Sequence, residues 1–132
     1  MDTQNKFRPE PLVSIVDDNV SVRRSTRRLL LCSGFRAEAF ASAEDFLNSE
    51  ALMDTSCLLL DVRMPGMDGL ELQRHLAEIG RSFPIIFFSA RATEEEERRA
   101  RHAGASNFLR KPVSKEALLH ALRAVLERPP NH

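Results

Sequence analysis

Carboxylate side chains follow two of the five apolar runs in the sequence and could together hold a metal ion. Asp17 and Asp18 come directly after the first run, and Asp61 comes directly after the third. Three carboxylates gathered within several ångströms repel one another, and this raises the pKa of at least one of them. A hard divalent cation removes the repulsion, and Mg²⁺ prefers carboxylate, water and phosphate oxygens. We therefore predict a Mg²⁺ site, beside which an ionised aspartate could attack phosphorus.

Two further apolar runs end on groups that suit a phosphoryl ligand. Ser89 follows the fourth run and Lys111 follows the fifth, so a hydroxyl and an ammonium group could compensate phosphoryl oxygens. Taken singly, each of these polar residues is better explained as a loop or surface residue, and Asp18 or Asn19 as a helix N-cap. Complementary polar groups at four strand ends are hard to obtain by chance, so we favour a joint site.

The apolar runs that position these groups predict the strands of an α/β domain. They are short, show little alternation, and lie at Leu12–Val16, Ala37–Phe40, Cys57–Leu60, Ile85–Phe88 and Asn107–Leu109. Segments with helical periodicity separate them, and five alternations of strand and helix predict a doubly wound parallel sheet with helices on both faces. Its active face should lie at the carboxyl ends of the strands, where the strand order reverses.

Boundary residues agree with this pattern. Glycines follow three helical segments, at Gly34, Gly80 and Gly104, where the left-handed conformation at a helix end favours glycine. Polar residues that can cap helices precede the second to fifth segments, at Ser42, Asp68, Thr93 and Ser114.

The composition is that of one ordinary globular domain. The chain has 132 residues, of which 42% are hydrophobic and 29% charged, and its formal net charge is +0. We expect a single domain over residues 1–132, with a core at about 12–127 and loose ends at 1–10 and 128–132. No apolar stretch approaches the roughly 18 residues of a membrane span, and none resembles a signal peptide, so we expect a cytoplasmic protein. The neutral charge argues against a nucleic-acid binder. Cys32 and Cys57 are expected to be small buried hydrophobic residues.

The motifs around these strand ends resemble those of the receiver domain of two-component response regulators, most closely the FixJ/NarL type. The resemblance runs from about Leu12 to Leu126 and depends on the order and spacing of four motifs: Val16-Asp17-Asp18, Leu60-Asp61-Val62-Arg63-Met64-Pro65-Gly66-Met67-Asp68-Gly69, Ser89-Ala90 and Phe108-Leu109-Arg110-Lys111-Pro112.

The resemblance implies a role for each matching residue. Asp61 would be the phospho-acceptor, with Mg²⁺ held by Asp18 directly, by Asp17 through water and by the backbone carbonyl of Arg63. Ser89 would be the switch hydroxyl and Lys111 the family's lysine. Phe108, in place of the commoner Tyr, would be the aromatic switch residue, which rotates from a solvent-facing to a buried position; the alternative is a permanent core residue. The fold implied is a flavodoxin-like (βα)5 sandwich with strand order 2-1-3-4-5. The Lys111–Pro112 peptide bond would be cis.

The resemblance also implies a signalling switch rather than a dedicated enzyme. A sensor histidine kinase would supply the phosphoryl group, and the chain would catalyse only its own phosphorylation and slow autodephosphorylation. Phosphorylation would remodel the surface of Arg91–Gly104, Ser106–Arg110 and the last helix, which could also carry a phosphorylation-dependent homodimer. Arg63 and Arg91 flank the chemistry, and we expect slow autodephosphorylation if either guanidinium covers the phosphoryl group; simple solvation of both is an equal alternative.

Other functions are weaker fits to the sequence. A haloacid-dehalogenase-type phosphatase wants an aspartate two residues after the nucleophile, where this chain has Arg63. A flavodoxin-like FMN domain wants a Gly/Ser/Thr-rich loop after the first strand, which is absent from the sequence. A receiver-like scaffold that works without phosphate remains open, although the full set of aspartates and Lys111 counts against it. The sequence does not decide between a stand-alone receiver and one domain of a transcription factor.

Overall fold

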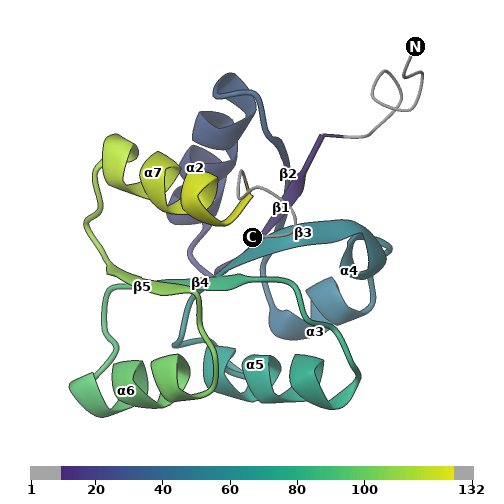
Figure 1. The fold of residues 1–132 in the computed structure, drawn as a ribbon, viewed down its shortest axis with the longest axis vertical. Helices are drawn as coiled ribbons and strands as arrows, with labels where there is room; N and C mark the ends of the chain where they lie inside the picture. The colour runs from purple at the N-terminus through teal and green to yellow at the C-terminus, as the bar shows by residue number, and fades with distance from the viewer. Residues whose placement is uncertain (1–9, 127–132) are drawn as a thin grey trace.

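Five strands form a single parallel sheet. The computed structural model describes residues 10–126, and the strands are β1 (Leu12–Val16), β2 (Arg36–Phe40), β3 (Thr55–Leu60), β4 (Ile85–Ser89) and β5 (Asn107–Arg110) (Figure 1). Their order is β2-β1-β3-β4-β5, and every neighbouring pair is parallel. The predicted doubly wound sheet of order 2-1-3-4-5 is therefore confirmed.

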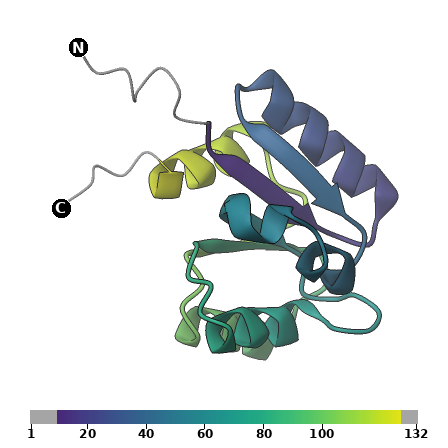
Figure 2. The same ribbon diagram turned by 90° about the vertical axis from the view of Figure 1, so that its right-hand side faces the viewer.

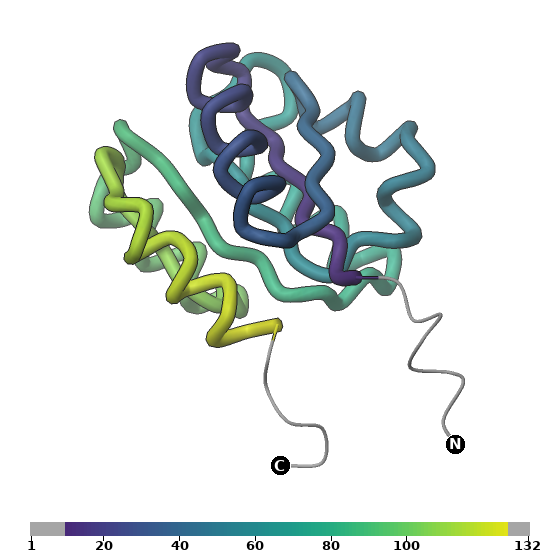
Figure 3. Tube along the Cα trace, turned by 90° about the horizontal axis from the view of Figure 1, so that it is seen from above, coloured from purple at the N-terminus to yellow at the C-terminus, as the bar shows by residue number. Residues whose placement is uncertain are grey.

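Helices cover both faces of this sheet. They are α2 (Val20–Cys32), α3 (Ala43–Leu47), α4 (Ala51–Asp54), α5 (Gly69–Glu78), α6 (Glu94–His102) and α7 (Lys115–Leu126). Figure 2 shows the sheet between α2 and α7 on one side and α5 and α6 on the other, and Figure 3 looks down on the side that carries α2 and α7. The molecule thus has the three layers expected of right-handed crossovers.

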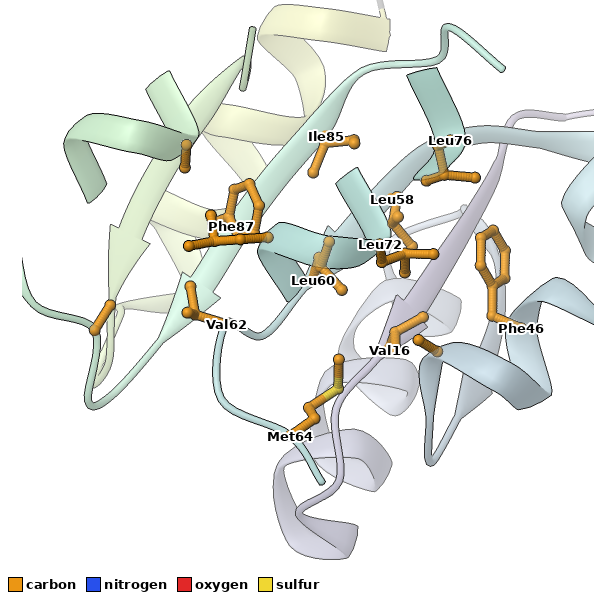
Figure 4. Packing of buried hydrophobic residues seen from close by; sticks show 14 of the residues in the cluster. Val16, Phe46, Leu58, Leu60, Val62, Met64, Leu72, Leu76, Ile85 and Phe87 are labelled. Atoms are coloured by element: carbon orange, nitrogen blue, oxygen red, sulfur yellow. The ribbon is translucent and has the colours of Figure 1, made fainter. Parts of the chain in front are cut away.

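The central strand β3 supplies side chains to two separate cores. Leu58 and Leu60 pack with buried residues of the side that carries α3, α5 and α6, among them Phe46, Leu72 and Leu76 (Figure 4). Cys57 and Leu59 point to the opposite side, where they join Leu30, Leu118 and Leu122 of α2 and α7. Burial on both faces explains why this strand reads as a continuous apolar run.

The predicted caps are present. The side chains of Ser42 and Ser114 accept hydrogen bonds from the backbone N–H groups of Asp45 and Ala117. Asp68 with Glu71, and Thr93 with Glu96, form reciprocal capping boxes at the starts of α5 and α6. Asn19, one of the two candidates, caps α2. These caps satisfy backbone donors that a helix start leaves unpaired.

Two expectations need correction. The second helical segment is split into α3 and α4, because the Ser49 hydroxyl and N–H both bond the carbonyl of Phe46 and close a turn after α3. Cys32 is exposed at the end of α2, whereas Cys57 is buried as expected, and burial raises the pKa of its thiol to about 12. The expected loose ends lie outside the described residues, apart from Glu10. No helix between residues 10 and 126 is long and apolar enough to span a bilayer.

Candidate functional site

The three predicted carboxylates meet at the carboxyl ends of two neighbouring strands. Val16 pairs with Leu60 in the parallel β1–β3 ladder, so Asp17, Asp18 and Asp61 follow the paired strand ends. One carboxylate oxygen from each lies within 4.8 Å of the others. Oxygen ligands at this spacing, two of them on buried residues, match the donor set that Mg²⁺ prefers.

Asp17 is the most tightly held of the three. It is buried, and its Oδ1 accepts the N–H of Asn19 at 2.9 Å, while its Oδ2 accepts the Lys111 ammonium at 2.7 Å. The guanidinium of Arg23 donates to its backbone carbonyl at 2.8 Å. Asp18 is exposed, so of the two adjacent carboxylates it is the one open to solvent and ions.

Asp61 lies at the centre of the site with few donors of its own. It is 9% exposed, and its Oδ1 accepts the N–H of Arg63 at 3.4 Å. The Lys111 ammonium lies 3.9 Å from its Oδ2. Burial raises the pKa of Asp61, the charge of Lys111 opposes that rise, and the charge of Asp17 adds to it. The ionised carboxylate is therefore short of compensating positive charge, as expected of a group that meets a cation or a phosphoryl ligand.

The loop after Asp61 is folded back against it. The N–H of Gly69 donates to the carbonyl of Val62, and a Cβ on Gly69 would lie only 2.2 Å from the carbonyl oxygen of Asp61. Only glycine allows this approach. The Glu44 carboxylate of α3 accepts the N–H of Met67 at 3.1 Å and holds the loop from the other side. No sequence signal pointed to Glu44, because its partner lies 23 residues away.

Ser89 and Lys111 complete the site from β4 and β5. The N–H of Lys111 donates to the carbonyl of Ser89 at 2.9 Å, so the two strand ends are joined directly. The Ser89 hydroxyl is fully buried and makes no hydrogen bond of normal geometry among residues 10–126, although it lies near enough to Asp61 to lower the pKa of that carboxyl. A buried hydroxyl without a partner is costly, and a ligand oxygen at Asp61 would remove that cost. The Lys111–Pro112 bond is cis, as the resemblance implied.

Comparison with known proteins identifies this arrangement. Residues 13–123 match the family model of the response regulator receiver domain. The chain belongs to this family. Phosphorylation by a histidine kinase, in two-component systems, is the family's general function, and Mg²⁺ is its typical cofactor.

Named relatives and solved structures agree. The chain is 42% identical to the response regulator TmoT of Ectopseudomonas mendocina over 92% of its length and 55% of that protein. It is 41% identical to nodulation protein W of Bradyrhizobium diazoefficiens, over 89% of this chain and 52% of that protein. The structure of FixJ-N superposes with a TM-score of 0.81 at 31% identity, covering 95% of this chain and all of that one. The structure of the response regulator StyR superposes with a TM-score of 0.82 at 43% identity, covering 90% of this chain and 60% of that one.

This receiver spans about half the length of the curated relatives it matches. The similarity therefore concerns the receiver portion of those proteins.

Phe108, the predicted aromatic switch residue, faces inward. Phe108 is 5% exposed and stacks on Phe87, with ring centroids 5.6 Å apart and planes at 21°. The guanidinium of Arg110 lies over the ring at 5.4 Å and donates to the Ala92 carbonyl at 2.7 Å and to Glu97 at 2.8 Å. Phe108 is therefore enclosed between a core ring and a bridging cation.

The two arginines that flank the chemistry differ in their surroundings. The guanidinium of Arg63 forms an ion pair with Glu96 of α6 at 3.0 Å, and makes none with Asp61. Arg91 is exposed, and its side chain has no bonding partner in the part of the chain that the structure describes. Sequence reasoning identified Arg63 but missed Glu96, which lies 33 residues along the chain. Rotamer choice, which decides this contact, leaves no trace in the sequence pattern.

Proposed function

We propose that this receiver is a phosphorylatable switch in which Asp61 accepts a phosphoryl group from a sensor histidine kinase. The observation that carries the proposal is the position of Asp61. Its carboxylate is nearly buried, lies beside two other aspartates and the Lys111 ammonium, and has a raised pKa. A carboxylate short of positive charge is a good nucleophile once a cation is bound beside it.

The chain's own residues have distinct parts in this transfer. A carboxylate oxygen of Asp61 attacks the phosphorus, a new P–O bond forms, and the bond from phosphorus to the donor nitrogen breaks. Mg²⁺, held by Asp17, Asp18, Asp61 and the Arg63 carbonyl, would supply positive charge to the phosphoryl oxygens. Lys111, 2.7 Å from Asp17 and 3.9 Å from Asp61, can add a second cation. The Ser89 hydroxyl can donate a hydrogen bond.

The switch would follow from the Ser89 hydrogen bond. As Ser89 moves toward the phosphoryl group, the space that it leaves would be filled by Phe108. Because Phe108 is already buried here, this coupling also requires an outward position of its ring before phosphorylation. Arg110 links Phe108 and β5 to the start of α6, so the movement would reach the face of α6, β5 and α7. We propose this face as the output surface and as the interface of a phosphorylation-dependent dimer.

The test is intact-mass analysis after incubation with acetyl phosphate and Mg²⁺. We expect one phosphoryl adduct, lost in Asp61→Ala and in the presence of a chelator, and retained in Asp68→Ala, which removes an aspartate that only caps α5. An adduct on Asp61→Ala, or none on the wild-type chain, would contradict the proposal. A dedicated phosphatase would instead hydrolyse the intermediate as fast as it forms, so rapid phosphate release with no adduct accumulating on the wild-type chain would favour that alternative.

The same samples test the switch. Hydrogen exchange should change on phosphorylation in α6, β5 and α7 and stay unchanged in α2, and gel filtration should show whether the phosphorylated chain is larger. Unchanged exchange in α6 and β5 would contradict the proposed route.

A further inference from the structure

One ion pair joins the phospho-acceptor loop to α6. The guanidinium of Arg63 lies 3.0 Å from Oε1 of Glu96, and the two side chains are 51% and 21% exposed. Arg63 is itself bound to the site, because its N–H donates to the Asp61 carboxylate. The ion pair therefore holds the guanidinium of Arg63, a residue two positions after Asp61, against the first turn of α6.

Glu96 has a fixed position. Its Oε1 also accepts the N–H of Thr93 at 2.9 Å, and its own N–H donates to the Thr93 hydroxyl at 3.0 Å, which is the capping box of α6. The Thr93 N–H, together with Arg63, lowers the pKa of Glu96 and keeps the carboxylate ionised at neutral pH. The capping box anchors Glu96, whereas the Arg63 side chain makes no other hydrogen bond or ion pair among residues 10–126, so Arg63 is the member that would move if the pair broke.

We propose that Glu96 is a positioning residue that sets the lifetime of the phosphoryl group by holding Arg63 away from it. The inference rests on the proposed function. In hydrolysis, water attacks the phosphorus, the P–O bond to Asp61 breaks, and inorganic phosphate leaves with a proton released from the water. A guanidinium released from Glu96 would pair with two phosphoryl oxygens and cover the phosphorus from solvent. Glu96 competes for the same cation and so keeps the path of water open.

The expected effect is modest. A partly exposed ion pair is a weak restraint, so releasing Arg63 should slow hydrolysis by about threefold rather than abolish it. The direction of the effect, and its dependence on Arg63, identify the mechanism better than its size does.

The decisive variant is Glu96→Gln. Glutamine also serves at the third position of a capping box, so this substitution removes the charge and keeps the cap. After removal of acetyl phosphate, intact-mass analysis over time should show the adduct decaying about threefold more slowly than in the wild-type chain. Arg63→Ala and the double variant Arg63→Ala/Glu96→Gln should decay at the same rate as each other.

Glu95→Gln is the matched control. Glu95 lies next to Glu96 on α6 but binds Arg98 of the same helix instead of Arg63, so its loss should leave the decay within twofold of wild type. Equal decay of Glu96→Gln and wild type would overturn the inference. Slowing that persists without Arg63 would overturn it too, because Glu96 would then act through α6 itself. A wild-type chain that forms no adduct would overturn the proposed function and this inference together, whereas a normal adduct with unaltered Glu96→Gln decay would overturn this inference alone.

Discussion

Asp61 is placed where its charge favours phosphoryl chemistry and disfavours folding. It is buried beside a second buried carboxylate, Asp17, which takes the shorter contact with the Lys111 ammonium. The pKa of Asp61 is raised as a result, mainly by burial. A raised carboxyl pKa means that the folded state holds the proton more tightly than the unfolded state, so ionisation costs stability.

We therefore expect Asp61→Asn to stabilise the receiver at neutral pH. With no metal present, the loss of wild-type stability begins as the pH rises past the ordinary carboxyl value of 3.8 and is complete above the raised pKa of folded Asp61. Asparagine does not titrate, so its advantage should be small in acid and reach its full size once the pH exceeds the raised pKa of folded Asp61. A gain of roughly 2–6 °C in Tm is expected at pH 7. Thermal melts followed by circular dichroism from acid to neutral pH measure it.

Asp68→Asn is the control for this prediction. Asparagine caps helices as well as aspartate, so this variant should show no pH-dependent gain. Mg²⁺ should stabilise wild type more than Asp61→Asn, because the cation offsets the same repulsion. An Asp61→Asn gain that is largest in acid, or a loss at pH 7, would contradict the argument.

At the residue scale, which residues gather at the site was easier to predict than the contacts between them. The residues that end strands at the site, Asp17, Asp61, Ser89 and Lys111, could be named from the sequence because a parallel sheet brings its carboxyl ends together. Their pairing could not. The structure gives the shorter Lys111 contact to Asp17, at 2.7 Å against 3.9 Å to Asp61, and this depends on the rotamers of the three side chains.

At the element scale, α6 is held to the receiver at its acidic first turn. Glu96 binds Arg63 of the loop after Asp61, and Glu97 binds Arg110 of β5. Arg110 also donates to the carbonyls of Ala92 and Thr93, just before the helix. Negative charge at the start of a helix is stabilised by the helix dipole. Here the same carboxylates also bind α6 to the loop after Asp61 and to β5.

We expect Arg110→Ala to loosen the first turn of α6 without unfolding it. Its loss removes one ion pair and two hydrogen bonds to carbonyls, each worth about 1 kcal/mol or less at an exposed position. Amide exchange at residues 94–97 should become roughly fivefold faster, because 1 kcal/mol corresponds to about that factor. Mass spectrometry of short peptides from the exchanged chain measures it.

Arg101→Ala is the control that distinguishes the link between α6 and β5 from simple pairing of the Glu97 charge. Arg101 also pairs with Glu97 but lies within α6 and makes no bridge to β5. Its removal should affect exchange at residues 94–97 less than Arg110→Ala does. Equal effects would mean that the local charge, rather than the link to β5, holds the helix start.

Element prediction succeeded where one physical signal dominated. All five strands were predicted, because burial on both faces leaves uninterrupted apolar runs. The split of the second helical segment was missed, since the Ser49 side chain competes with backbone bonds only in the folded geometry. Strands β2 and β3 begin earlier than predicted, at Arg36 and Thr55. These strand starts, like the interrupted helix, depend on contacts between elements and not on the local sequence pattern.

At the scale of the whole molecule, β3 is the element that makes two cores into one cooperative unit. Its successive side chains Leu59 and Leu60 are each 1% exposed or less and enter opposite cores. The strand also pairs with both β1 and β4. Neither face can therefore unfold without removing the support of the other.

Leu59→Ala and Leu60→Ala should consequently have similar effects, although they enlarge different cores. Each leaves a cavity of equal nominal size and is expected to cost 2–5 kcal/mol, at the scale of known leucine truncations. Urea denaturation should be followed by far-ultraviolet circular dichroism, because the chain has no Trp and no Tyr to provide fluorescence. We expect one transition in each variant, with an unchanged slope and a lower midpoint, since the slope reports the surface exposed in unfolding. A biphasic curve, or a slope that falls in one variant alone, would show that the layer of α2 and α7 unfolds separately from the layer that carries α5 and α6. In that case the sheet could not be what couples Asp61 to the proposed output surface of α6, β5 and α7.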